Sequence, residues 1–173
     1  MISKKFTLFF LVILCLEIIS GEIGFTTGIY ILKPAIVGSL IYTVAKHGFR
    51  ENSAFIAALV FSLLGDILLM LPSENLFLFG LGSFLVTHLF YIAVFRKKAT
   101  FKPFLTVAFL ISVIGFFLLI LNNKIPEALT LPVLIYMFVI TVMGITASSI
   151  NGNKIAIYSL SIGAILFIIS DSL

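Results

Sequence analysis

The length and composition of this 173-residue chain exclude a soluble globular protein. Hydrophobic residues make up 61% of the sequence and charged residues 10%, against about 45–50% and about 25% in a typical soluble domain. The 11 basic and 7 acidic side chains are too few to cover the apolar runs with a polar shell. The net charge of +4 lies mostly in short loops, which indicates membrane topology and no nucleic-acid partner.

Seven apolar runs follow one another along the chain. A bilayer core of about 30 Å requires about 20 helical residues, and the predicted spans are 6–23, 28–46, 53–71, 76–95, 103–121, 129–149 and 155–173. The runs are about twice as long as barrel strands and lack two-residue alternation. The predicted fold is therefore all-α, a polytopic bundle of about seven transmembrane helices that forms a single domain over residues 1–173.

The distribution of lysine and arginine predicts the orientation. Nine of the 11 lie in alternate connections, and the other two, Lys33 and Lys124, lie on the opposite side. By the positive-inside rule the N-terminus is cytoplasmic, and we expect the cell (inner) membrane to hold the protein. After an odd number of spans the chain would end on the outer face. There, Asp171-Ser172-Leu173 close an apolar helix without a basic anchor, so either this helix stops at the membrane surface or the natural chain continues.

Five titratable residues fall inside the predicted spans, where a charged group is costly and is a candidate functional residue. They are Glu17, Lys33, Asp66, His88 and Asp171. At a rise of about 1.5 Å per residue, all of them except His88 fall within roughly 10 Å of the same membrane face. Tyr136 lies just beneath that level and His88 near the middle of the bilayer. The shared depth predicts one polar pocket in the outer half of the membrane.

Each of these residues also has a structural interpretation. Glu17 and Asp171 could lie at the membrane interface, and Lys33 could extend to the headgroups. His88 could be a hydrogen-bonded histidine that joins two helices. Asp66 could be half of an ion pair with Lys33.

Other residues point to packing or to the surface. Gly80 and Gly82 indicate close helix packing rather than function. A metal site has little support, because the chain has two histidines, one of them His47 in a basic loop, and neither an H-E-x-x-H motif nor a cysteine pair. A nucleophilic serine is equally unsupported, since the G-x-S-x-G motif is absent.

Several motifs run in order from the second predicted span to the last residue. They are Lys33-Pro34, the segment Ser62-Leu63-Leu64-Gly65-Asp66-Ile67-Leu68-Leu69-Met70, the stretch from Gly80 to His88 and Tyr91, then Tyr136, and finally the run from Gly163 to Ser170-Asp171-Ser172. In this combination the chain resembles the YhhN-type lysoplasmalogenase family. The family usually has about eight spans, so the C-terminal end of this chain is expected to be truncated by one helix.

The resemblance implies hydrolysis of the vinyl-ether bond of a lysoplasmalogen to a fatty aldehyde and a glycerophospho-alcohol, without a cofactor. The implied partners are a lysophospholipid substrate and the lipid bilayer. Such chemistry needs protonation of an alkenyl carbon and capture of an oxocarbenium ion by water. One carboxyl group kept protonated in an apolar site and a second, ionised carboxylate could divide these tasks. Asp66 and Asp171 are the candidate catalytic pair, and the assignment between them stays open.

Further residues are candidates for binding or orienting the substrate: Lys33, His88, Tyr91, Tyr136, Ser170 and Glu17. Lys33 would hold one carboxylate ionised or meet the lipid phosphate, while His88 and Tyr136 would form orienting hydrogen bonds. The main alternative is a small transporter or lipid-binding bundle whose buried charges line a substrate path. A third possibility is an enzyme of this fold that acts on another ether or ester lipid. The sequence does not indicate the head group or the oligomeric state.

Overall fold

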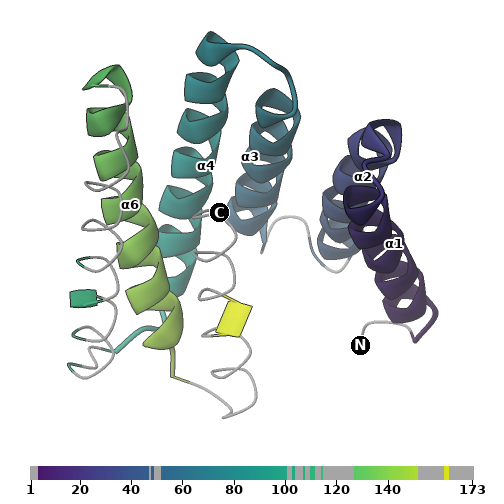
Figure 1. Ribbon diagram of the computed structural model, residues 1–173. Coiled ribbons are helices and arrows are strands. Elements are labelled where there is room, and N and C mark those ends of the chain that lie inside the picture. Colours follow the sequence, from purple (N-terminus) through teal and green to yellow (C-terminus); the bar gives the residue numbers. More distant parts are fainter. Residues whose placement is uncertain are drawn as a thin grey trace. The chain divides into compact units, whose positions relative to one another are not determined.

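The protein is all-helical in the part of the chain that the structure describes, apart from one isolated β-bridge. The structure, a computed structural model, describes residues 4–46, 48, 52–100, 103, 107, 110, 111, 114, 127–151, 162 and 163. Its helices are α1 (Lys4–Glu22), α2 (Thr26–Lys46), α3 (Ser53–Leu69), α4 (Glu74–Phe95) and α6 (Glu127–Ser148), shown in Figure 1. These bounds lie within about two residues of five predicted spans. The predicted all-α fold is therefore confirmed for the described residues.

Three helices in the described part of the chain are long and apolar enough to cross a membrane, and the protein is accordingly an integral membrane protein. The candidate spans are Thr26–Lys46, Asn75–Phe95 and Leu129–Ser148. α3 is apolar but has 17 residues, and α1 carries two lysines at its start and two glutamates in its second half. The described residues therefore do not support the predicted count of seven spans. Most of the predicted spans 103–121 and 155–173 lies outside the described residues.

A tight glycine turn joins α1 to α2. Gly24 adopts a φ of 68°, a left-handed conformation that glycine accepts without steric cost. The N–H of Phe25 donates to the carbonyl of Ser20 at 2.8 Å, and that of Gly24 donates to Gly21 at 3.1 Å. These two bonds satisfy carbonyl groups that the end of a helix leaves open. α1 and α2 consequently form an antiparallel helical hairpin.

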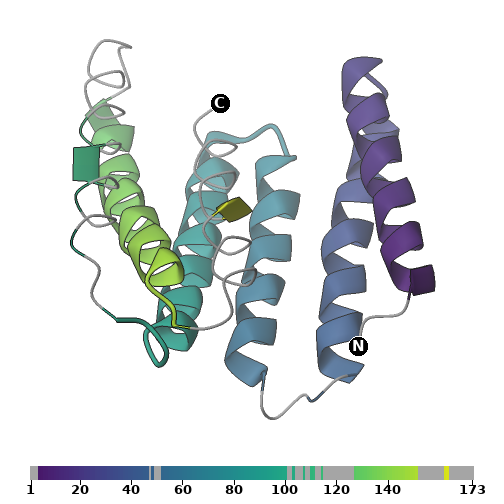
Figure 2. The same cartoon turned by 90° about the horizontal axis from the view of Figure 1, so that it is seen from below.

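Two compact units divide the chain, Met1–Thr87 and His88–Leu173. In the first unit α2 contacts both α1 and α3. The first part of α4 belongs to this unit and packs against α3, as Figure 2 also shows. In the second unit the remainder of α4 lies beside α6 (Figures 1 and 2).

Small residues bring α3 and α4 close together. Ala58 and Thr87 are both fully buried, and the Thr87 hydroxyl donates to the Ala58 carbonyl at 3.1 Å. A Cβ atom on Gly80 would lie 3.4 Å from the carbonyl oxygen of Gly65, whereas one on Gly82 would have no described atom of another helix within 4 Å. Small residues at such positions allow helix backbones to approach. The packing prediction is therefore confirmed for Gly80, and for Gly82 it stays a prediction.

The ends of α4 and α6 are tied together in the second unit. Ala99 and Ile150 form an antiparallel β-bridge. Beside it, the N–H of Thr100 donates to the carbonyl of Ser149 at 2.8 Å, and the N–H of Asn151 donates to the carbonyl of Lys98 at 2.9 Å. α4 and α6 thus end at the same face and run in the same direction (Figure 1).

Candidate functional site

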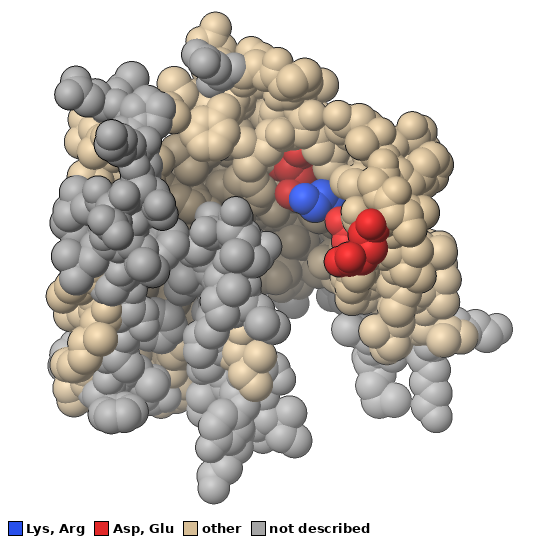
Figure 3. Space-filling view, viewed as in Figure 1, with Lys and Arg blue, Asp and Glu red and all other residues tan. Residues whose placement is uncertain are grey.

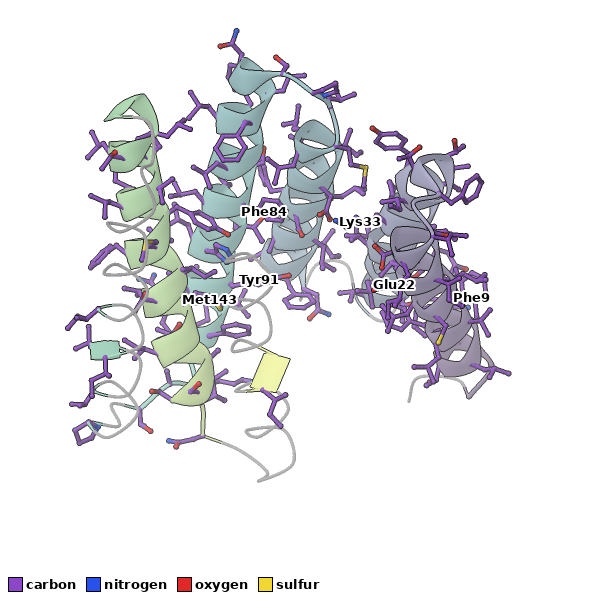
Figure 4. All side chains as sticks on the ribbon, in the orientation of Figure 1. Phe9, Glu22, Lys33, Phe84, Tyr91 and Met143 are labelled. Carbon is purple, nitrogen blue, oxygen red and sulfur yellow. The ribbon has the colours of Figure 1, made fainter. Side chains whose placement is uncertain are left out.

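Asp66 lies near the end of α3 with its side chain half-buried. The helix continues past it, because the N–H of Met70 donates to the Asp66 carbonyl at 3.1 Å. Lys33 is exposed on α2, and Figure 4 shows it on the side of α2 that faces α3. The two helices contact each other. The first unit therefore presents a carboxylate and an ammonium group from neighbouring helices.

Charged side chains gather at one place on this unit. Figure 3 shows acidic side chains around a cationic one, and Figure 4, in the same orientation, labels Lys33 in that region. The acidic side chains that the structure describes in this unit are Glu17, Glu22 and Asp66. Glu17 is half-exposed on α1, and Glu22 is exposed at the end of that helix. Opposite charges close together lower the free-energy cost of placing each group in an apolar bundle.

A tyrosine links α2 to the end of α3 on the same side as these charges. The hydroxyl of Tyr30 donates to the carbonyl of Met70 at 3.0 Å. Tyr30 precedes Lys33 by three residues and Met70 follows Asp66 by four, spacings that place each pair on one helix face. The hydrogen bond therefore holds α2 and α3 together one turn away from Lys33 and Asp66.

His88 and Tyr136 form a buried pair in the second unit. His88 Nε2 lies 3.1 Å from Tyr136 Oη, and the ring centroids are 5.5 Å apart at an interplanar angle of 51°. The two residues are 0% and 7% exposed. The structure thus brings together two residues that are 48 positions apart in the sequence. It also agrees with the interpretation of His88 as a hydrogen-bonded histidine that joins two helices.

The remaining predicted site residues are placed as follows. Tyr91 is half-buried on α4, and its ring stacks on Phe95 at 5.7 Å and 11°. Ser170 and Asp171 lie outside the described residues. Among the residues that are described, no group of three or more histidine, cysteine, aspartate or glutamate side chains could hold a metal ion. The titratable groups among the described site residues are carboxyl, ammonium, imidazole and phenol groups.

Comparison with known proteins identifies the family. The profile of the YhhN family matches residues 28–173. The chain belongs to the YhhN family. Two curated relatives, from Mycobacterium bovis and Mycobacterium tuberculosis, are each named lysoplasmalogenase and are 30% identical over 159 residues. The alignment covers 85% of this chain and 60% of each relative, so the chain spans about 60% of their length. No solved structure has a significant match to the chain.

The predicted family resemblance is confirmed, and the predicted site residues fall either inside or outside the matched stretch. Lys33, Asp66, His88 and Tyr136 lie within the stretch that matches the YhhN family, whereas Glu17 precedes it. The match to the family model thus begins within α2. The charged residues of α1 precede it.

Two buried residues of α4 were not predicted from the sequence. Phe84 covers Gly65 of α3, and Thr87 bonds to the α3 backbone. Both share one helix face with Gly80, at spacings of four and three residues. This helical spacing from Gly80, which places all three residues on the face of α4 that packs against α3, is the signal that could have identified them.

Proposed function

We propose that this protein hydrolyses the vinyl-ether bond of lysoplasmalogens and releases a fatty aldehyde and a glycerophospho-alcohol. The observation that carries the proposal is the match to two relatives named lysoplasmalogenase over 85% of this chain. Membership of the YhhN family over residues 28–173 supports it. Asp66 and Lys33, on neighbouring helices, and the buried His88–Tyr136 pair supply groups of the kind that the reaction needs.

The reaction consumes one water and needs no redox step. A carboxylic acid donates its proton to the alkenyl carbon that is not bonded to oxygen, which leaves an oxocarbenium ion. Water adds to the cationic carbon and loses a proton to a carboxylate, giving a hemiacetal. The hemiacetal hydroxyl then loses its proton to a carboxylate as the bond from this carbon to the glycerol oxygen breaks, a carboxylic acid protonates that oxygen, and the aldehyde is released. Two carboxyl groups with different protonation states suit these steps, as in glycosidases.

Asp66 is one member of the proposed carboxyl pair, and Asp171 is the other. Asp66 is half-buried on an apolar helix, in the unit that also presents Lys33. We propose that Lys33 either binds the phosphate of the lipid or keeps one carboxylate of the pair ionised. We assign to His88 and Tyr136 the role of orienting the substrate by hydrogen bonds.

We further propose that the N-terminus is cytoplasmic and that the cell (inner) membrane holds the protein. Arg96, Lys97 and Lys98 are exposed directly after α4. The shared end of α4 and α6 supports the grouping of these residues with the basic connection that follows α6. The predicted outer half of the membrane then contains Lys33 and Asp66.

A lipid assay tests the proposed function. Purified protein in lipid nanodiscs is incubated with an alkenyl lysolipid and with an acyl lysolipid of matched head group and chain length. We expect aldehyde from the alkenyl substrate and no fatty acid from the acyl one. Saturable binding without product would favour a transporter or a lipid-binding bundle. Release of fatty acid would favour an ester hydrolase of the same fold.

The variant Asp66→Asn tests the role of this carboxyl group. The change removes both the acid proton and the negative charge while keeping the shape, so kcat should fall by at least about 100-fold with little change in KM. Glu22→Gln is the matched control, because Glu22 is exposed and precedes the stretch common to the family. It should retain wild-type kcat.

A double variant separates catalysis from an ion pair. Loss of the negative charge of Asp66 leaves Lys33 with fewer acidic neighbours, and stability is expected to fall by up to several kcal/mol. Asp66→Asn is therefore combined with Lys33→Met, which removes the cation. If the double variant is folded and as active as wild type, Asp66 is half of a structural ion pair and its catalytic assignment is wrong.

A further inference from the structure

The ring of Phe84 lies directly against the backbone of Gly65. A Cβ atom on Gly65 would be 2.8 Å from Phe84 Cδ2 and Cε2 and 3.1 Å from Cγ. Carbon atoms do not approach so closely without displacement, so the ring occupies the volume that a side chain at position 65 would need. Figure 4 shows Phe84 on the side of α4 that faces α3. Phe84 is 7% exposed, and the ring is therefore enclosed.

This contact bears on Asp66, which follows Gly65 in the chain. α3 cannot rotate or move towards α4 at this level without displacing a buried aromatic ring. One turn before Phe84 on α4, a Cβ atom on Gly80 would lie 3.4 Å from the Gly65 carbonyl oxygen. Towards the other end of α3, the bond from Thr87 to Ala58 fixes the register of the two helices.

We propose that Phe84 is a positioning residue for the proposed hydrolysis, acting through Gly65 to fix the depth and direction of the Asp66 carboxyl group. The expected effect on kcat rests on the proposed function, whereas the effect on the position of the Asp66 carboxyl group does not. Phe84 does not need to touch the substrate. Its ring holds the backbone of α3 in the place that the acid–base step requires, and an ordinary core residue would affect stability alone.

The kinetic test compares two phenylalanines of α4. Phe84→Leu keeps an apolar side chain but removes the flat ring, so kcat should fall about 10-fold while KM stays nearly constant, as expected for a displaced catalytic group. Phe79→Leu is the matched control, because Phe79 is 66% exposed on the same helix. It should keep the wild-type kcat. An unchanged kcat for Phe84→Leu would overturn the proposal.

A pair of glycine variants tests whether Phe84 acts through Gly65. Gly65→Ala should lower kcat, because the new methyl group collides with the ring. Gly82→Ala should have no effect, because Gly82 is exposed and no described atom of another helix lies within 4 Å of the new methyl group. In the double variant Gly65→Ala/Phe84→Leu the methyl group meets a smaller side chain, so activity should exceed that of Gly65→Ala alone. If the two effects are additive, Phe84 does not act through Gly65.

A chemical readout separates this inference from the proposed function. A hydrophobic carbodiimide modifies protonated carboxyl groups, and peptide mass spectrometry follows its reaction with Asp66 at constant pH. The rate should differ from wild type in Phe84→Leu and be unchanged in Phe79→Leu. If aldehyde is never formed but this difference is found, the proposed function fails and the positioning role stands. Equal modification rates in the wild type and in Phe84→Leu overturn the positioning role. If Phe84→Leu does not fold, Phe84→Met takes its place under the same criteria.

Discussion

The variant Tyr136→Phe examines the buried pair that joins α4 to α6. It removes only the phenol oxygen, which lies 3.1 Å from His88 Nε2, and it keeps the ring and its packing. His88 is fully buried, so water cannot replace the lost hydrogen bond at Nε2. A buried polar atom that loses a partner costs about 1–3 kcal/mol, and hydrogen bonds between membrane helices contribute about 0.6–2 kcal/mol. We therefore expect a loss of about 1–2 kcal/mol in the free energy of unfolding.

Reversible unfolding in mixed detergent micelles measures this loss, followed by a double-mutant cycle with His88→Leu. Tyr42→Phe is the matched control, since Tyr42 is 67% exposed on α2, and it should change the free energy by no more than about 0.5 kcal/mol. The cycle should give a coupling energy of at least about 0.5 kcal/mol. If Tyr136→Phe is as stable as wild type, the pair contributes nothing to holding the two helices together.

Two further predictions concern topology and the α3–α4 contact. Single cysteines in place of Lys98 and Asn75, at opposite ends of α4, should differ in labelling by an impermeant reagent added to intact cells: position 75 reacts and position 98 does not, and the reverse result would invert the orientation. Thr87→Val should lower the free energy of unfolding by about 1 kcal/mol through loss of the bond to Ala58. Thr27→Val, at an exposed position of α2, should have almost no effect, and equal changes in both variants would show that the interhelical bond contributes nothing.

The sequence was sufficient to predict where the described helices begin and end. Long apolar runs separated by glycine and asparagine leave few other choices in a bilayer, where each backbone N–H must find its partner within a helix. Even Pro34 and Pro132, which lie inside α2 and α6, did not divide the predicted spans. The number of transmembrane spans was harder to predict than the helix bounds. α3 is shorter than a full bilayer crossing, and α1 carries charges at both ends.

The contacts between helices were less predictable. Depth in the membrane can be counted along each run, but the rotation of a helix about its axis cannot, since a lipid-facing surface and a buried surface are both apolar. Gly80 and Gly82 illustrate this limit, because only Gly80 faces α3. For the same reason the sequence identified His88 and Tyr136 as separate candidates but did not predict their direct hydrogen bond. The shared site of Asp66 and Asp171 stays a prediction.

The central claim is that the protein cleaves a vinyl ether by protonating its alkenyl carbon, and the origin of the hydrogen atom on that carbon tests it most directly. The purified protein converts an alkenyl lysolipid in deuterated water, and the aldehyde is reduced at once and analysed by mass spectrometry. We predict one deuterium atom on the carbon next to the former aldehyde carbon in each product molecule. Aldehyde without this deuterium, or no aldehyde from wild-type protein that binds the lipid, would contradict the account.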